Sequence, residues 1–315
     1  MTPSVLVLAG LYDFASDLVC LRLKERGVEF LRLNREQLPE FRVTLDPLGP
    51  TLRVRNGECA WNVTTELRSV WYRQPVFLRE IGCASEDVAA QLERSQWMAF
   101  IRALTVFQDA AWMNHPRETF QAETKPFQLA LAYSVGFRIA PTLIGNDSLA
   151  FDALESPFAI KPLDTVLLRD GDDSLFAYTT RSDAADYIQS LRQAPVIGQR
   201  LLSPKIDIRM TVVGQAVYGV RILRNGKPIE GDWRKVPKAE LQYEDWSPPS
   251  QISIACVNLN ARLGLVFGGI DLIENEEGIF FIEVNPTGEW GWLNSATRSI
   301  DSAIAEWLAS GGKGL

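Results

Sequence analysis

The sequence predicts an α/β protein built from two or three subdomains. Its 315 residues exceed what one hydrophobic core usually organises. The chain opens with an apolar strand, an amphipathic helix and a second strand, an order typical of a small α/β domain. Near the C-terminus, two apolar strands flank a polar turn, which predicts a β-hairpin. These features favour an N-terminal α/β unit and a C-terminal unit that contains the hairpin.

The N-terminal unit is predicted from the alternation of apolar runs with polar turns. Strands are expected at residues 4–9, 29–34, 51–63 and 69–75, and helices at 13–27 and 85–110. Within 51–63, Asn56-Gly57 predicts a hairpin turn. Ser85 is the expected cap of the second helix, ahead of an acidic first turn. The unit contains no GxGxxG, so a dinucleotide site is not supported.

The segment AWMNHPRE, at 111–118, predicts a turn or linker at the first domain boundary. Further helices are expected at 124–137, 183–194 and 250–264, and strands at 140–147, 157–163, 174–180, 196–202, 207–223 and in the final hairpin. We therefore divide the chain into domains at 1–115, 116–196 and 197–315.

Bulk properties argue against several classes of protein. The formal net charge of −7 does not favour nonspecific nucleic-acid binding, which depends on Lys and Arg neutralising phosphates. No stretch approaches the roughly 18 uncharged apolar residues of a membrane span. The N-terminus lacks a basic leader, so its apolar run predicts a first strand rather than a signal peptide. We expect a cytoplasmic protein without a membrane or nucleic-acid partner.

Cysteine and histidine are too few and too scattered to carry the chemistry. The four cysteines have no CxxC pairing and are expected to be buried structural thiols: Cys20, Cys59, Cys83 and Cys256. The single histidine, His115, precedes a proline, where a structural role in a turn is favoured over a catalytic one. The chemistry therefore falls mainly to Lys, Arg, Asp, Glu and Asn.

The C-terminal hairpin carries the strongest local signal. With the turn at residues 275–278, Asp271 lies within one residue of the position opposite Glu283, and Asn285 shares a strand face with Glu283. Three oxygen ligands then converge from two strands, which suits Mg²⁺ completed by nucleotide phosphates and water. The alternative is a solvated sheet face. The apolar flank FFIEVNP favours the metal site, because a buried carboxylate must be paired or bound to metal.

Several cations and polar residues precede the hairpin. Lys125 begins a helix and Lys161 lies in an otherwise uncharged apolar strand, so both are candidate phosphate ligands, with surface positions as the alternative. Residues 196–213 predict a strand, a short linker able to contact an adenine edge, and another strand. The polar members of that linker are Gln199, Lys205 and Asp207. Three arginines follow as candidate clamps for phosphoryl oxygens, with surface ion pairing as the alternative: Arg209, Arg221 and Arg234.

In this order, these residues resemble the nucleotide and magnesium ligands of the ATP-grasp fold. More narrowly, the strings SVWYRQP, KPFQLALAYSVGFRIAPTLIGND, KIDIRMTVVG, DWR and GGIDLIE…FIEVNPTGEWGW resemble the microviridin-type ligases, or graspetide synthetases. The resemblance covers nearly the whole chain. It implies an α/β (α+β) ATP-grasp protein with an N-terminal pre-ATP-grasp α/β domain, a central domain carrying a phosphate lid and the leader-peptide site, and a C-terminal antiparallel-sheet domain.

The resemblance also implies a role for each candidate. Lys125 and Lys161 would contact the phosphates of ATP. Gln199 and the neighbouring backbone of Arg200 and Leu201 would hold the adenine, with Lys205 and Asp207 nearby. Mg²⁺ would be held by Asp271, Glu283 and Asn285. Arg221 and Arg234 would steady the transferring phosphoryl group and the acyl phosphate, and Arg209 would be a further catalytic residue. The loop after Lys161 has few small residues, which departs from the usual ATP-grasp phosphate loop.

The activity implied by this similarity is ADP-forming ligation. ATP would phosphorylate a side-chain carboxylate of a ribosomal precursor peptide, and a hydroxyl or amine of that peptide would attack the acyl phosphate to close an ester or amide ring. The 163–178 hairpin would act as a lid that excludes water. No nucleophile from the enzyme is required. A homodimer is compatible with the same resemblance.

Three other functions remain open at this stage. A relative of the ribosomal-protein glutamate ligases would add a free amino acid to a carboxylate. A nucleotide-binding module would bind without turnover, although the intact set of candidate metal ligands argues against it. Phosphoryl transfer to the hydroxyl of a small molecule has weaker motif support.

Overall fold

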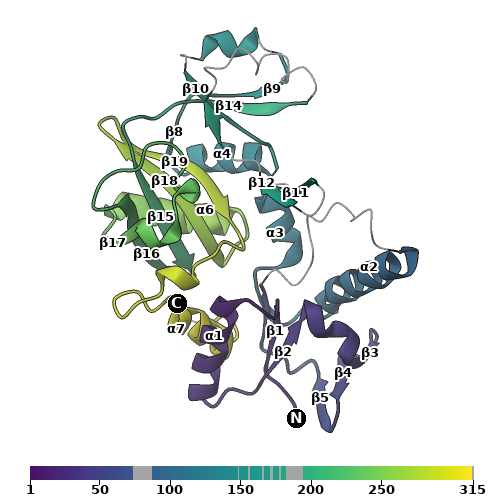
Figure 1. Cartoon of the computed structure of the whole chain (residues 1–315). Coiled ribbons are helices and arrows are strands. Elements are labelled where there is room, and N and C mark those ends of the chain that lie inside the picture. Colours follow the sequence, from purple (N-terminus) through teal and green to yellow (C-terminus); the bar gives the residue numbers. More distant parts are fainter. Residues whose placement is uncertain are drawn as a thin grey trace.

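A computed structural model of the chain describes residues 1–73, 87–147, 149–154, 157–164, 167–170, 173–176, 179–181 and 194–313. Figure 1 shows an N-terminal unit at the bottom, a large sheet above it and a small sheet at the top. Within the described residues, no helix combines the length and the apolar character needed to cross a membrane.

The N-terminal unit is built on a four-stranded parallel sheet of order β2-β1-β6-β7. Its strands are β1 (Val5–Ala9), β2 (Phe30–Asn34), β6 (Ser69–Tyr72) and β7 (Ala111–Met113). Every residue of β1 is buried, which explains its unbroken apolar sequence. Helix α1 (Phe14–Glu25) follows β1 as predicted. The expectation that 111–118 is only a linker was wrong, because its first three residues form β7.

A second, antiparallel sheet of order β3-β4-β5 completes this unit. Its strands are β3 (Arg42–Asp46), β4 (Thr51–Asn56) and β5 (Cys59–Val63). The hairpin of β4 and β5 bends at Gly57-Glu58, one residue later than predicted, because Asn56 pairs with Cys59. The same unit also contains the α-helix α2 (Val88–Ala103) and two short 3-10 helices, η1 (Arg35–Glu40) and η2 (Leu104–Val106).

Two details of the N-terminal prediction need correction. The cap of α2 is Asp87, whose carboxylate accepts a hydrogen bond from the Ala90 N–H at 2.7 Å. The predicted cap Ser85 lies outside the described residues, as does Cys83. Among the other cysteines, Cys256 is buried and Cys20 is partly buried, but Cys59 is exposed, so burial was wrong for that residue.

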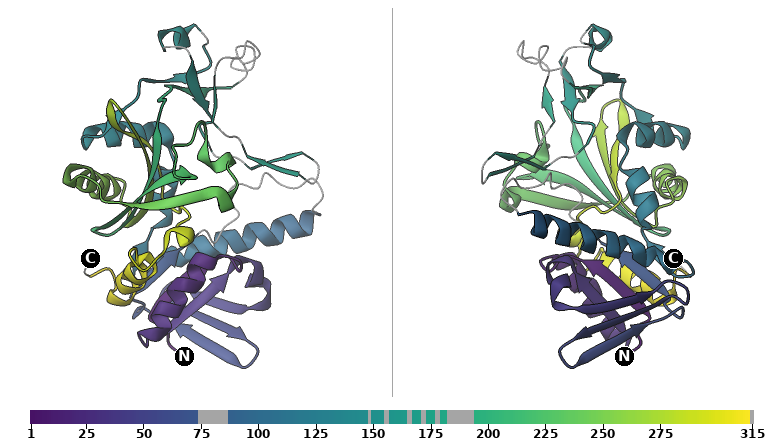
Figure 2. Two further views of the ribbon diagram at one scale, coloured as in Figure 1. Left: turned by 60° about the vertical axis from the view of Figure 1, so that its left-hand side comes forward. Right: turned by 90° about the vertical axis from the view of Figure 1, so that its right-hand side faces the viewer.

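The central region forms a small antiparallel sheet of order β13-β10-β14-β9. Its strands are β9 (Thr142–Gly145), β10 (Phe158–Lys161), β13 (Thr180–Arg181) and β14 (Val196–Arg200), with η3 (Ala150–Ala153) nearby. The hairpin of β11 (Leu167–Asp170) and β12 (Asp173–Phe176) projects from the body of the molecule (Figure 2). The predicted helix at 183–194 lies outside the described residues except for Ala194.

The largest sheet has six strands in the order β17-β16-β15-β18-β19-β8. They are β8 (Arg138–Ile139), β15 (Ile206–Val213), β16 (Ala216–Arg224), β17 (Leu241–Trp246), β18 (Phe267–Asn275) and β19 (Gly278–Asn285). All pairs are antiparallel except β19 with β8. The remaining elements of this region are α3 (Pro116–Ala122), α4 (Lys125–Ser134), η4 (Trp233–Lys235), η5 (Lys238–Glu240), α6 (Ser250–Arg262) and η6 (Gly291–Leu293).

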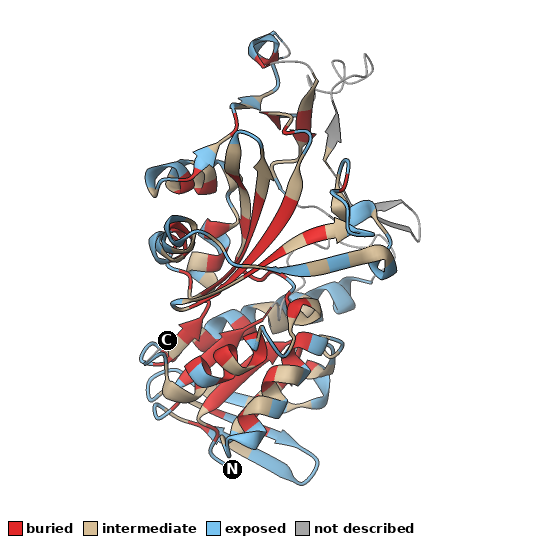
Figure 3. Ribbon diagram, turned by 90° about the vertical axis from the view of Figure 1, so that its left-hand side faces the viewer, coloured by how far each residue is buried: buried red, intermediate tan, exposed pale blue. Residues whose placement is uncertain are grey.

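Helices α4 and α6 cover one face of this sheet, which we call the helix face. Apolar side chains of β15, β18 and β19 pack there against both helices, and these strands are largely buried in Figure 3. Because side chains alternate along a strand, the intervening residues point to the opposite face, which we call the site face.

A C-terminal helix, α7 (Ile300–Ser310), was not predicted. It packs against α1 (Figure 1), and one apolar core joins α1 and β1 to α7 and to residues of β15, β16 and β18. Strand pairing also crosses the predicted boundaries, since β8 belongs to the large sheet and β14 ends in the small one. The domain division at 1–115, 116–196 and 197–315 therefore remains a prediction.

Candidate nucleotide and metal site

The hairpin of β18 and β19 brings Asp271 directly opposite Glu283. Its turn lies where it was predicted, with Asn275 paired to Gly278. From that turn, regular pairing would place Ile282 opposite Asp271 and turn Glu283 to the helix face. The register shifts between Asp271 and Leu272 because β19 contains a one-residue bulge. The bulge brings Glu283 and Asn285 onto the site face beside Asp271.

Two arginines hold these acidic side chains. Arg209 of β15 donates to Asp271 Oδ1 at 2.7 Å, and both side chains are buried. A single nitrogen of Arg234, Nη2, donates to Asp271 Oδ2 at 3.0 Å and to Glu283 Oε1 at 2.7 Å. The Asn285 amide lies 3.5 Å from Asp271 Oδ2. One positively charged group thus already bridges the two carboxylates.

The position of Arg209 depends on two glycines. A Cβ on Gly269 would lie 2.7 Å from Arg209 Nη2, and a Cβ on Gly288 would lie 2.6 Å from the same atom. The guanidinium therefore occupies space that any side chain would fill at either position. Its Nη2 also donates to the Glu289 main-chain oxygen at 3.3 Å, which ties the site to the loop after β19.

The cluster fits a hard cation. Its donors are two carboxylates and one amide oxygen, and one small cationic centre already reaches both carboxylates. Within the described parts of the chain, no group of three or more Asp, Glu, His and Cys side chains forms a metal site. A set with two carboxylates is what Mg²⁺ uses when phosphates and water complete its coordination.

The electrostatics of the two carboxyls differ. Burial raises the pKa of Asp271, although Arg209 and Arg234 oppose that effect. Burial also acts on Glu283, but the positive charges of Arg234, Lys125 and Lys161 outweigh it and lower the pKa of that carboxyl to about 2. Glu283 is therefore ionised at neutral pH, as a metal ligand must be.

The two lysines reach the same place from different elements. Lys125 begins α4, and its Nζ donates to the Pro162 main-chain oxygen at 3.0 Å and lies 3.9 Å from Glu283 Oε2. Lys161 ends β10 and donates to Gln199 Oε1 at 2.7 Å. Burial, assisted by the nearby Lys125 and Arg234, lowers the pKa of Lys161 to about 8. Both predicted phosphate ligands thus lie beside the acidic cluster.

The adenine-side residues are placed differently from the prediction. Gln199 and Asp207 lie in β14 and β15, and only Lys205 lies in the linker between these strands. Gln199 is buried and also donates to Thr142 Oγ1 at 2.9 Å, so its side chain is held within the small sheet. Lys205 pairs with Asp207, whose pKa is raised by burial.

The linker backbone itself lies where the two sheets meet. Arg200 N–H donates to the Pro141 oxygen at 2.8 Å, and the Arg200 side chain donates to Glu277 at 2.8 Å. Leu201 is half-buried and directly follows β14. Arg200 and Leu201 therefore connect the small sheet to the large one.

Arg221 is not brought to the cluster. It lies opposite Ile208, on the helix face, whereas Arg209 lies opposite Val220. Its Nη2 donates to Glu274 at 2.7 Å, and its guanidinium lies over Trp246. The structure therefore separates Arg221 from the site that the sequence analysis assigned to it.

Two features had no counterpart in the sequence analysis. Arg73, directly after β6, donates to the Thr287 oxygen and, at 2.8 Å, to Glu289, so the N-terminal unit contacts the loop after β19. Buried amides of Asn114 and Gln128 also bind the main chain around Asn285. Their partners are backbone atoms distant in sequence, which no local pattern indicates. His115 caps α3 and lies 2.8 Å from Glu118, consistent with the structural role expected.

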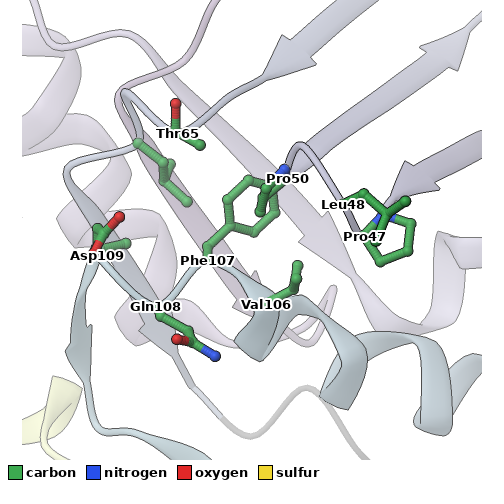
Figure 4. A pocket seen from close by; sticks show the side chains of 10 residues that line it. Pro47, Leu48, Pro50, Thr65, Val106, Phe107, Gln108 and Asp109 are labelled. Atoms are coloured by element: carbon green, nitrogen blue, oxygen red, sulfur yellow. The ribbon is translucent and has the colours of Figure 1, made fainter.

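A pocket elsewhere does not belong to this cluster. It lies in the N-terminal unit, between the β3–β4 turn and the segment that precedes β7 (Figure 4). Its lining combines Phe107, Val106, Pro47 and Pro50 with polar residues such as Asp109. None of the candidate site residues lines it.

Comparison with known proteins finds solved structures that are similar over nearly the whole chain. No protein-family model and no curated protein matches the sequence. The macrocyclase MdnC of Microcystis aeruginosa MRC, solved with precursor peptide MdnA, is similar with a TM-score of 0.80 and 22% identity, over 98% of this chain and 99% of that one. A RiPP-associated ATP-grasp ligase of Chryseobacterium gregarium, solved with ADP and a leader and core peptide, gives 0.78 and 22%, over 97% and 96%.

The ATP-grasp ligase PsnB, solved with a phosphomimetic variant of a minimal precursor, Mg and ADP, is similar with a TM-score of 0.77 and 24% identity. The similarity covers 99% of both chains. Each of these likenesses extends over nearly the whole chain, including the N-terminal unit. The chain therefore has the ATP-grasp fold.

Proposed function

We propose that the chain is an ATP- and Mg²⁺-dependent carboxylate ligase that forms ester or amide crosslinks within a ribosomal precursor peptide in the cytoplasm, releasing ADP and phosphate. The observation that carries the proposal is the convergence of Asp271, Glu283 and Asn285 on the site face, with Arg209 and Arg234 against them. Lys125 and Lys161 complete a set suited to binding a metal–nucleotide complex.

In this proposal Asp271, Glu283 and Asn285 hold Mg²⁺. Bound there, Mg²⁺ supplies Lewis-acid neutralisation of phosphoryl oxygens. Lys125 and Lys161 bind phosphate oxygens, and the backbone of Arg200 and Leu201, at the junction of the two sheets, holds the adenine in this proposal. Arg234 contacts the carboxylates of both Asp271 and Glu283, so its guanidinium would lie beside a bound metal–nucleotide complex and would stabilise the transferring phosphoryl group.

The chain's own groups account for the remaining requirements of ligation. A carboxylate of the peptide attacks the γ-phosphorus of ATP and ADP leaves, which gives an acyl phosphate; a hydroxyl or amine then attacks the acyl carbon, loses its proton and displaces phosphate. Among the described residues, the cluster presents cations and acids and no cysteine or histidine nucleophile, which agrees with transfer directly between substrate groups. The projecting β11–β12 hairpin is the proposed lid that keeps water from the acyl phosphate.

The three similar structures support the choice of substrate. Each was solved with a precursor peptide, and two were solved with ADP. Their likeness to this chain includes the N-terminal and central regions as well as the candidate nucleotide site. The leader-peptide site is proposed for the central domain.

Mass spectrometry tests the proposal. The purified chain is incubated with ATP, Mg²⁺ and candidate precursor peptides that contain Thr, Ser or Lys together with Asp or Glu, and ADP is measured in parallel. The expected product is lighter than the peptide by one water for each bond formed. A product heavier by an amino-acid residue would instead establish addition of a free amino acid. Nucleotide binding with no ADP release from any peptide would contradict the ligase and favour a binding module.

A further inference from the structure

The outer edge of β19 is only partly covered by another strand. On one side β18 pairs with β19 along its length, but on the other side β8 pairs only with Phe280 and Phe281. Val284, three residues further along, has no strand partner on that side among the described residues. Buried main-chain groups at such an edge need other hydrogen-bond partners.

The side chain of Gln128 supplies those partners. Its Oε1 accepts from the Val284 N–H at 3.0 Å, and its Nε2 donates to the Val284 oxygen at 2.8 Å. Nε2 also donates to the Ala122 oxygen at the end of α3. The amide is buried and makes two opposed hydrogen bonds to one residue, as a neighbouring strand would.

Val284 lies between two of the three candidate metal ligands. Glu283 and Asn285 project to the site face from either side of it, while Val284 itself is buried on the helix face. Fixing the peptide groups of Val284 therefore fixes the directions of both ligands. Gln128 lies one helical turn after Lys125, so the same turn of α4 also places Lys125 3.9 Å from Glu283.

A second buried amide holds the chain on the other side of Asn285. Asn114 Nδ2 donates to the oxygens of Pro286 and Phe267, each at 2.8 Å. Its Oδ1 accepts from the N–H groups of Val266, at 2.8 Å, and Phe267, at 2.9 Å. Asn114 directly follows β7 of the N-terminal unit, so it connects that unit to the start of β18 and the end of β19.

We infer that Gln128 and Asn114 are positioning residues for the metal site, acting on the main chain at Val284 and Pro286 to hold Asn285 and Glu283 in their binding directions. This inference rests on the proposed function, because it assumes that these residues bind a divalent cation. Hydrogen bonds that orient metal ligands typically change metal affinity by about 10- to 100-fold when removed. The hydrogen-bond partners of both amides are main-chain groups, and neither amide is among the groups proposed to bind the metal or the nucleotide.

The test uses Mn²⁺ as the probe, with its binding to the full chain in the presence of ADP followed by electron paramagnetic resonance. Gln128→Met keeps the length of the side chain and removes both hydrogen bonds, whereas Gln128→Asn keeps the amide and shortens it by one methylene. For both variants the dissociation constant for Mn²⁺ should rise about 10- to 100-fold. The affinity for ADP without metal should change less than about twofold, since Gln128 is not among the groups proposed to bind the nucleotide.

A matched control separates positioning from loss of stability. Leu131 lies on the same helix and packs against the same apolar core, but its side chain cannot form a hydrogen bond to Val284, so Leu131→Ala should lower the thermal midpoint and leave Mn²⁺ affinity unchanged. The inference fails if either folded Gln128 variant binds Mn²⁺ as tightly as the unaltered chain. It also fails if Leu131→Ala weakens Mn²⁺ binding as much as the Gln128 variants do. Failure of the unaltered chain itself to bind Mn²⁺ with ADP would instead overturn the metal site of the proposed function, and this inference with it.

Discussion

The two faces of the large sheet are made by the same strands and have opposite properties. On the helix face, Ile208, Met210 and Leu272 are almost fully buried and pack against α4 and α6. On the site face, the neighbouring positions are Arg209 and Asp271, also buried, but joined by an ion pair. At these positions one face buries apolar area, whereas the other buries an ion pair.

This difference separates stability from function within single strands. Burial of apolar side chains stabilises the sheet, whereas buried ion pairs contribute little net stability because desolvation offsets their attraction. Charges retained in such a position therefore point to a role other than folding. The comparison predicts that substitutions on adjacent residues of one strand will change different measured quantities.

The largest effect is expected from Glu283→Gln. The amide keeps the size of the side chain but removes the charge that pairs with Arg234 and the proposed metal. ADP release with peptide should fall by about 10²- to 10³-fold or more, while circular dichroism shows a folded chain. Asp271→Ala should likewise abolish turnover.

The matched control is Glu276→Gln, at an exposed position in the turn of the same hairpin. Its turnover should stay within about twofold of the unaltered chain, since surface charges contribute little. Full activity of Glu283→Gln would show that the site face does not carry the chemistry.

The opposite outcome is expected from Leu272→Ala, one residue after Asp271. Leu272 is 1% exposed and lies in the core against the helices. Its truncation should lower the free energy of unfolding by about 2–5 kcal/mol, measured by denaturant titration. ADP release per folded molecule should remain within about threefold. A large loss of turnover in a folded Leu272→Ala chain would contradict the separation of the two faces.

The sequence predicted the hairpin well and the faces of its residues less well. The turn at Asn275–Gly278 is marked by polar residues between apolar runs, so the near opposition of Asp271 and Glu283 followed from counting. The bulge at Ile282 carries no such mark, because either register buries apolar residues. Without the bulge, Glu283 would face the helices.

Arg221 was misplaced for a different reason. Its face depends on the register of β15 and β16, which is set by the loop Gly214-Gln215 between Val213 and Ala216. Gly214 has a φ of +58°, as such tight hairpins require. Recognition of this two-residue loop in VVGQAV would have placed Arg209 and Arg221 on opposite faces. Gln128 and Asn114 left no comparable signal, because their partners are main-chain atoms of distant segments.

A smaller effect is expected from pH through Lys161. Burial holds the pKa of this lysine at about 8, whereas nucleotide phosphates would favour its charged form and raise the pKa. Below about pH 8 the lysine is protonated in both states, so pH has little effect on binding. Above that pH, binding must take up a proton, and ADP affinity should fall by up to about tenfold per pH unit.

Calorimetry in buffers of different ionisation enthalpy measures this proton uptake directly. Lys161→Met should bind ADP more weakly at neutral pH and lose the proton uptake near pH 8.5. Equal proton uptake by the unaltered chain and by Lys161→Met would assign the titration to another group.

The smallest effect is expected from Arg221→Gln, and it gives the sharpest comparison of the two faces. Arg221 and Arg209 lie on neighbouring strands, and each donates to one acidic residue at 2.7 Å. The pair of Arg221 with Glu274 is about one-third exposed and lies on the helix face, so its loss should change the free energy of unfolding by at most about 1 kcal/mol. Turnover should stay within about threefold.

Arg209→Gln leaves the carboxylate of Asp271 buried without its closest partner. It should lower the free energy of unfolding by about 3–5 kcal/mol and remove most of the activity. If a folded Arg221→Gln chain lost turnover as Arg209→Gln does, the strand face would not decide which arginine takes part in catalysis, and Arg221 would have to reach the nucleotide by a rearrangement of β16.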